Sequence, residues 1–181
     1  MLSRVARRIY WMARYIERAE NIARLVNTYH FLLLDMPRGT RIGWDVLPII
    51  TGGYDLFSER YQRHDQRNTG KFLLADDSNP GSLLNSITSA RENCRTVREV
   101  LPRSSWEKLN ELYLYAKEHV QTGLTKGGRD GFLNQIIAGS QQFTGLLASV
   151  MYRDAAWQFA RLGRNLERAD MTTRIIDVRS T

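Results

Sequence analysis

The chain opens with SRVARRIYWMARYIERAENIARLVNTYHFLLL, residues Ser3 to Leu34, a stretch without proline or glycine. Its apolar residues recur at alternating spacings of three and four positions, which places them on one face of an α-helix. They are Val5, Ile9, Met12, Ile16, Ala19, Ala23 and Val26, with Trp11, Tyr15, Ile22 and Leu25 beside them. The stretch therefore predicts a long helix, buried across much of its circumference, that ends before Pro37 and Gly39.

The rest of the chain is also predicted to be helical. Longer helices are expected over residues 80–100, 104–121, 132–151 and 153–177, and the segment 40–79 holds shorter pieces between its prolines and glycines. Ser104 and Glu107 have the spacing of a capping box at the start of the second of these helices. Strand signals are weak throughout. The sequence thus predicts an all-α fold, an antiparallel helical bundle, with residues 1–181 forming a single domain.

Two of the expected helices carry the same motif, Arg-x-x-Glu-Arg-Ala-acid. When the chain is shifted by 150 positions, the charged residues of the first copy coincide with those of the second, and the apolar positions agree as well. The charged pairs are Arg14 with Arg164, Glu17 with Glu167, Arg18 with Arg168, Glu20 with Asp170 and Arg24 with Arg174. We therefore expect two long, equivalent, motif-bearing helices that lie side by side as pseudo-symmetric neighbours.

A helical wheel at about 100° per residue separates the two charges of the motif. Glu17 falls on the polar side of its helix, whereas Arg18 lies beside the apolar face, and Arg168 is placed likewise. A structural interpretation makes these arginines partly buried partners of carboxylates on neighbouring helices, because an unpaired buried charge is costly. The i,i+4 pairs Glu20–Arg24 and Asp170–Arg174 would then be surface ion pairs.

A functional interpretation brings the arginines and carboxylates together at a cleft between helices, where they bind an anionic or peptide-like ligand. Glu17 and Glu167 are then the candidate catalytic carboxylates. The candidate ligand-binding residues are Arg14, Arg18, Arg24, Arg91, Glu92, Asn93, Arg164, Arg168, Asp170 and Arg174. The residues alone favour the structural interpretation and leave the functional one open, since ion-pair networks and binding sites look alike in a sequence.

Composition narrows the remaining classes of function. The formal net charge of +7 and the isoelectric point near 9.8 raise nucleic acid as a partner, but the arginines alternate with acidic residues, a pattern that favours ion pairs between helices. No apolar run approaches the length of a membrane span. The lone Cys94 suits a reducing cytoplasm, and the three scattered histidines suggest neither a metal site nor a cofactor.

Several blocks of the sequence resemble the bacterial alpha-E family, which is named for an α-helical domain with a Glu-Arg motif. The blocks include Ile9 to Asn21, Asn79 to Ser82, Ala90 to Asn93 and Leu162 to Asp170, and they cover almost the whole chain. The resemblance implies an association with a circularly permuted ATP-grasp protein and a transglutaminase-like protein, and hence with a system that forms and cleaves amide bonds on peptides. Members of the family usually run longer than this chain, so the resemblance implies a short member or a fragment.

Three hypotheses of function follow, in order of preference. The first is a non-catalytic partner or substrate-presenting component of such an ATP-grasp system. The second is an enzyme that acts on a peptide or anionic substrate through the Glu-Arg motifs, and the third is a basic nucleic-acid-binding protein. The sequence leaves the oligomeric state open, a homo-oligomer included.

Overall fold

The computed structural model describes residues 1–37 and 42–178 of the chain. Within them the fold is all-α, and the helices pack together as predicted. The helices are α1 (Ser3–Asp35), α2 (Val46–Ile50), α3 (Tyr54–Arg60), α4 (Gln66–Leu74), α5 (Leu83–Arg95), the short 3-10 helix η1 (Arg98–Val100), α6 (Arg103–Gly123), α7 (Arg129–Val150) and α8 (Ala155–Asp177).

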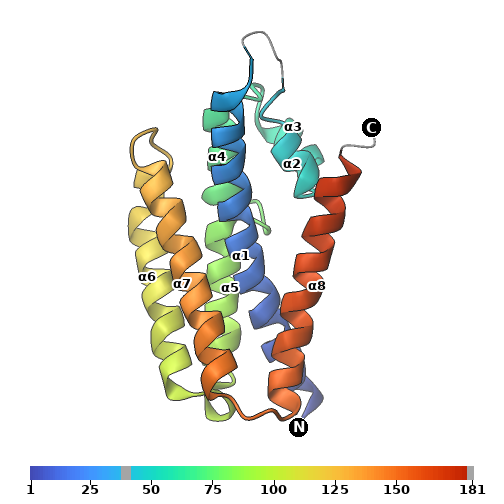
Figure 1. Ribbon diagram of the computed structural model, residues 1–181, viewed down its shortest axis with the longest axis vertical. Coiled ribbons are helices and arrows are strands. Elements are labelled where there is room, and N and C mark those ends of the chain that lie inside the picture. Colours follow the sequence, from blue (N-terminus) through green and yellow to red (C-terminus); the bar gives the residue numbers. More distant parts are fainter. Residues whose placement is uncertain (38–41, 179–181) are drawn as a thin grey trace.

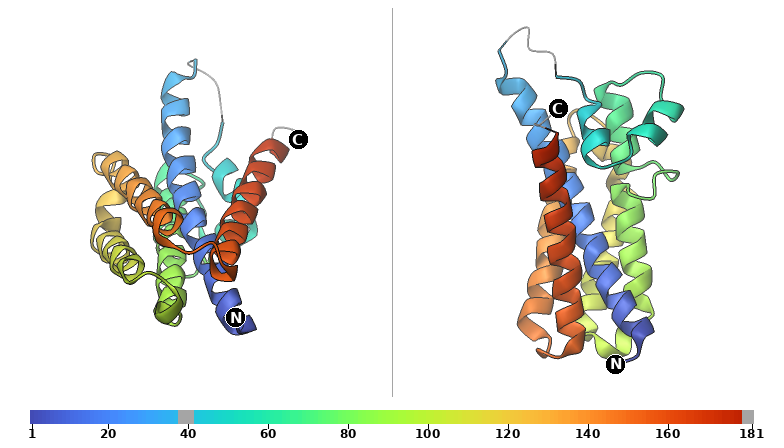
Figure 2. Two further views of the ribbon diagram at one scale, coloured as in Figure 1. Left: turned by 60° about the horizontal axis from the view of Figure 1, so that its bottom comes forward. Right: turned by 90° about the vertical axis from the view of Figure 1, so that its right-hand side faces the viewer.

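The central helix of the bundle is α1, which contacts α5, α7 and α8 (Figure 1). The outer helix α6 packs on α5 and α7, so that α6 and α8 lie at opposite sides of the molecule (Figure 1). Successive long elements alternate in direction, as expected for an antiparallel bundle. The long elements are α1, α5, α6, α7 and α8. Because α1 is the first and α8 the fifth of them, these two helices run in the same direction, which both views of Figure 2 also show.

The core forms around the apolar face of α1. Ile9, Met12, Ile16, Ala19 and Val26 are almost completely buried in it. Opposite them, α5 and α7 contribute their own buried apolar stripes, which include Leu83, Ile87, Ala90, Cys94, Phe132, Ile136 and Phe143. The same spacing of three and four residues that predicted these helices therefore also defines the faces that they bury.

The upper end of the bundle is closed by α2, α3 and α4 (Figure 1). Phe57 of α3 packs its ring against Phe72 of α4 with 5.2 Å between centroids, and both side chains are fully buried. The turn after α4 is held by Asp76, which accepts hydrogen bonds from the backbone and hydroxyl of Ser78 and from the hydroxyl of Tyr61. Asp76 is thus a structural element of this turn, with its carboxylate occupied by neighbours.

Some expected boundaries differ from the observed ones. The helix expected over residues 80–100 is shorter, because Ser82 caps the start of α5 and the chain leaves the helix after Arg95 to form η1. The expected capping box is wrong: α6 already begins at Arg103, and no side chain caps it. Proline at the preceding position fixes an extended backbone there, so the helix starts without help from Ser104.

Candidate functional site

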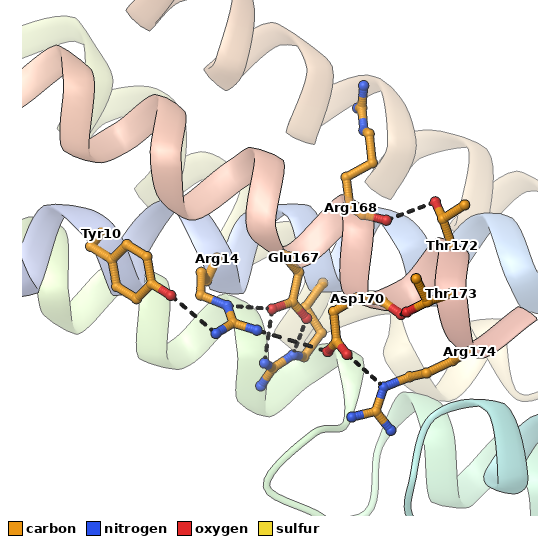
Figure 3. A network of polar contacts seen from close by, with 9 residues as sticks. Tyr10, Arg14, Glu167, Arg168, Asp170, Thr172, Thr173 and Arg174 are labelled. Carbon is orange, nitrogen blue, oxygen red and sulfur yellow. Dashed lines mark hydrogen bonds and ion pairs between the residues drawn. The ribbon is translucent and has the colours of Figure 1, made fainter.

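The two Glu-Arg motifs face each other across the seam between α1 and α8. Glu167 of α8 accepts hydrogen bonds from two arginines of α1 (Figure 3). Arg14 Nε lies 2.7 Å from Glu167 Oε2. Arg18 binds in a bidentate manner, with Nε 2.6 Å from Oε1 and Nη2 3.0 Å from Oε2. A bidentate guanidinium–carboxylate pair is among the stronger polar contacts in proteins.

The opposite pairing repeats this arrangement. Glu17 of α1 accepts from two arginines of α8: Arg168 Nε lies 2.7 Å from Oε1, and Arg164 Nε lies 3.2 Å from Oε2. In Figure 3 the Arg168 side chain accordingly points away from Glu167. Each glutamate is therefore held by the arginines of the other motif, and the 150-residue shift converts one half of the network into the other. We call Arg14, Glu17, Arg18, Arg164, Glu167 and Arg168 the reciprocal clamp.

Small residues allow the two helices to come close enough for these contacts. Gly163 lies in the seam against Tyr10, and both Gly163 and Ala13, its equivalent in the repeat, are buried. A Cβ atom on Gly163 would overlap the backbone carbonyl oxygen of Tyr10. The backbones of α1 and α8 thus touch one turn before the clamp, which brings short glutamate side chains within reach of the opposing arginines.

The clamp places its negative charges inside and its positive charges at the edge. The side chains of Glu17 and Glu167 are 1% and 3% exposed, whereas those of Arg18 and Arg168 are 23% and 53% exposed. Burial alone would lower the pKa of Arg14, but its bonds to Glu167 and Tyr10 outweigh burial and raise it. The bond to Glu17 raises the pKa of Arg168 in the same way, against a smaller effect of burial.

The helical-wheel placement of the motif is therefore wrong in one respect. It put Glu17 on the polar side and Arg18 toward the packed side, but the structure buries the glutamates. The seam between α1 and α8 is lined by alanine, glycine and glutamate, whose low hydrophobicity does not mark it as a packed face. The structural interpretation correctly anticipates that Arg18 and Arg168 pair with carboxylates on another helix.

The acidic residues that end each motif extend the clamp. The Asp170 carboxylate lies between Arg14 and Arg174 (Figure 3), 3.8 Å from Nη2 of Arg14 and 3.0 Å from Nε of Arg174. Asp170 and Arg174 form an exposed ion pair, as expected. Glu20 pairs with Arg24 at 2.8 Å, but its side chain is buried, so this is not the surface pair that the sequence suggested. Gln141 of α7 also lies 3.5 Å from Glu20, which links a third helix to the motif.

Three candidate residues on α5 lie apart from the clamp. Arg91 faces α6, where it binds Asn110 at 2.8 Å and lies over the rings of Trp106 and Tyr113. Glu92 pairs with Arg91 and Arg95 at the surface. Asn93 is buried and accepts a hydrogen bond from Arg8 of α1 at 3.1 Å. The middle helix thus supplies no wall to the clamp itself.

Of the cavities beside α1, two are lined in part by candidate residues, and neither of these two is lined by Glu17 or Glu167. One, of about 550 Å³, is lined by residues of α1 and α5 that include Arg4, Arg7, Arg8 and Trp11. The other, of about 260 Å³, lies between α1, α7 and α8 and includes Arg164. All four oxygens of the clamped carboxylates already accept N–H bonds, so the arrangement suits holding two helices together better than transferring protons.

Sequence reasoning missed the aromatic group at the second cavity. Arg153 and Arg161 both lie over the ring of Trp157, at 4.2 and 4.8 Å from its centroid. Arg161 follows Trp157 by four residues, and this i,i+4 spacing could have predicted the contact between these two side chains, though not that of Arg153. Across the described ranges, the histidine, cysteine and acidic side chains form no cluster of three that could hold a metal ion. None of the helices described is long and apolar enough to cross a membrane.

Comparison with known proteins agrees with this geometry. Residues 1–181 match the family model Alpha-E, described as a predicted alpha-helical domain with a conserved ER motif. The uncharacterized protein Mb2597 of Mycobacterium bovis is 27% identical over 191 aligned residues, and the uncharacterized protein Rv2567 of Mycobacterium tuberculosis is 26% identical. Each alignment covers 96% of this chain and only 22% of the relative.

No solved structure shows a significant match to the chain. The family is described by an α-helical domain and a Glu-Arg motif, and the structure contains both. The chain belongs to the Alpha-E family of α-helical domains.

Proposed function

We propose that the chain is a non-catalytic docking component of a cytoplasmic system in which an ATP-grasp-type and a transglutaminase-like protein make and cleave amide bonds on peptides. The observation that carries this proposal is an uncovered apolar face on α8. It consists of Phe159, Leu162, Leu166 and Ile176, here called the α8 stripe, which are 37–62% exposed.

The internal repeat allows the α8 stripe to be compared with the equivalent residues of α1. The residues of α1 equivalent to the α8 stripe are Ile9, Met12, Ile16 and Val26, and all four are at most 2% exposed. They are covered by α5 and α7, whereas α8 lies at the edge of the molecule (Figure 1). The two equivalent helices thus carry equivalent apolar faces. Within the described residues, the face of α1 is covered by other helices and the α8 stripe is not. Exposed faces of this kind mark sites of protein association.

The partner that fits is a helix with an apolar stripe of its own, packed on α8 as α5 packs on α1. We assign that helix to the ATP-grasp-type protein, because the Alpha-E resemblance implies such a partner. The chain spans only about a fifth of the length of its curated relatives, so most of each relative lies outside the matched region. Residues 1–181 would then be one all-α part of a larger unit.

The clamp supports a non-catalytic role over the enzyme hypothesis. A general acid or base must reach its substrate directly or through one water. Glu17 and Glu167 are buried, line neither cavity and are each bound by two arginines. The basic charge is likewise spread over ion pairs within the bundle, which gives the nucleic-acid hypothesis less support.

The test is binding between the purified chain and an ATP-grasp-type protein of the kind that the resemblance implies, measured by biolayer interferometry. The double variant Leu162→Glu/Leu166→Glu places two charges in the α8 stripe, and we expect it to weaken binding by at least about tenfold. The matched control is Leu114→Glu on α6, where a leucine is similarly exposed, at 53% against 47% and 44%. Circular dichroism and thermal unfolding of all variants check that the fold is intact.

Unchanged affinity in the double variant, or an equal loss in the control, would overturn the docking role of α8. Hydrolysis or ligation of peptides by the isolated chain, lost in Glu17→Gln or Glu167→Gln without unfolding, would instead establish the enzyme hypothesis.

A further inference from the structure

The cavity between α1, α7 and α8 has features that neither the clamp nor the α8 stripe explains. Its inner surface is apolar, formed by Ile16 of α1, Phe143 and Leu147 of α7, and Ala160 of α8. Trp157 forms one wall. Its volume of about 260 Å³ exceeds the roughly 150 Å³ of a cavity known to hold benzene. A phenyl ring with a short extension therefore fits within it.

The opening of the cavity is polar and positively charged. Arg161, Arg164 and Asn165 of α8 line it, together with Thr144 of α7. Arg161 lies over Trp157, with the centre of its guanidinium group 4.8 Å from the ring centroid. Throughout residues 1–37 and 42–178, no carboxylate pairs with Arg161. Its charge is thus fixed in position by the indole ring and free to meet an anion.

Arg164 connects the cavity with the reciprocal clamp. It uses Nε to bind Glu17 at 3.2 Å, the longest N–O contact in the clamp. Its two Nη groups make no further hydrogen bond within the described part of the chain. Arg161 and Arg164 are three residues apart in the sequence and therefore lie on the same side of α8. Both can approach one anionic group at the opening.

We propose that this cavity binds a carboxylate that carries an apolar body of about the size of a benzyl group. The body enters between Phe143 and Trp157, and the carboxylate meets Arg161 and Arg164 at the opening. A guanidinium group matches the planar geometry of a carboxylate with two parallel N–H bonds. The C-terminus of a peptide that ends in an aromatic residue has this chemistry, and so does a free arylalkanoic acid. The inference does not depend on the proposed docking function.

Three probes of matched shape test the site: N-acetylphenylalanine, 3-phenylpropionate and N-acetylphenylalanine amide. Binding is measured by isothermal titration calorimetry, and shifts of the Trp157 indole N–H resonance locate it. We expect the two acids to bind and the neutral amide to bind at least about tenfold more weakly, since a charge-assisted hydrogen bond is lost. Tighter binding of N-acetylphenylalanine identifies a peptide C-terminus as the ligand, and tighter binding of 3-phenylpropionate identifies a free acid.

The charge requirement is tested with Arg161→Gln, which we expect to weaken binding of the acids by about tenfold. Arg153→Gln is the matched control, because Arg153 also lies over Trp157, at 4.2 Å, but does not line the cavity. Arg164→Gln is less suitable, since it also removes a partner of the buried Glu17. Equal binding of acids and amide, an equal effect of both variants, or no binding of either acid at 10 mM, roughly the weakest affinity such a pocket would give, would overturn the proposal.

Discussion

The burial of Glu17 and Glu167 in the seam between α1 and α8 carries an electrostatic cost. An ionised carboxylate loses its hydration on burial, and only close opposite charges with good geometry compensate for that loss. Two arginines do so at each glutamate, at distances between 2.6 and 3.2 Å. The arginines keep part of their surface in water, which limits their own loss of hydration. Such a clamp makes the pairing of α1 with α8 highly specific.

Removing either buried carboxylate should destabilise the fold strongly. We expect Glu17→Gln and Glu167→Gln each to lower the free energy of unfolding by about 3 kcal/mol, because each removes the buried anion that two guanidinium groups share. The repeat predicts that the two losses are similar. Urea denaturation followed by circular dichroism measures them. Asp170→Asn is the control: its side chain is 41% exposed, so its loss should stay below about 1 kcal/mol. A loss as small as this in the two Gln variants would contradict the structural role of the clamp.

At the scale of the helices, glycine has opposite roles in two places. Gly163 lies where the backbones of α1 and α8 touch, and a methyl group there would overlap the Tyr10 carbonyl oxygen. Gly145 lies inside α7, and a Cβ atom on it would meet nothing within 4 Å. Helix propensity alone favours alanine at both positions. Only the helix packing distinguishes them.

We therefore expect Gly163→Ala to destabilise the protein by about 1–3 kcal/mol, because α8 must move away from α1 and lengthen the clamp contacts. Gly145→Ala should stabilise it by about 0.5–1 kcal/mol. Thermal unfolding of both variants by calorimetry gives the sign of each effect. Stabilisation by Gly163→Ala would show that the two helices do not approach each other as closely as described.

The helices could be anticipated to different degrees. The long elements α1, α6, α7 and α8 follow from apolar spacing and from the positions of proline and glycine, with ends that differ by a few residues. The short helices α2 and α4 have too few turns to show a period, and α4 is stabilised by contacts with α3 such as that of Phe72 with Phe57. Residues 96–100 leave the α-helix although their sequence continues the apolar pattern. The helix α5 ends at Arg95, and η1 follows before Pro102.

At the scale of the whole molecule, the sequence predicted that the two motif helices pair with each other, but not which of their residues are buried. The 150-residue shift identified both motif helices and their equivalence, and the clamp confirms that they are neighbours. It could not reveal that glutamate is the buried member, since burial here depends on the close approach of the two helices at Gly163. It also could not show that the α8 stripe is uncovered, because its pattern matches that of the buried face of α1.

Cys94 provides a reporter for the integrity of the whole bundle. It is completely buried on α5, and burial raises the pKa of its thiol to about 11, an effect that the charge of Arg98 only partly offsets. Since thiolate is the reactive form, we expect Ellman's reagent to modify the native protein at pH 8 only as fast as the bundle opens. Modification should become rapid in urea. Fast stoichiometric labelling of the folded protein would show that α5 separates from α1 without global unfolding.

The reciprocal clamp also makes each motif complementary to the motif of a second chain. Each motif contains both the acid and the bases that its partner requires, so the two helices are self-complementary in parallel register. An α8 released from its own bundle would find on the α1 of a second molecule the same contacts that it left. Only the short connection between α7 and α8, residues 151–154, keeps the exchange within one chain. The double motif would thereby also suit a domain-swapped assembly, in which α8 packs on the α1 of a second molecule.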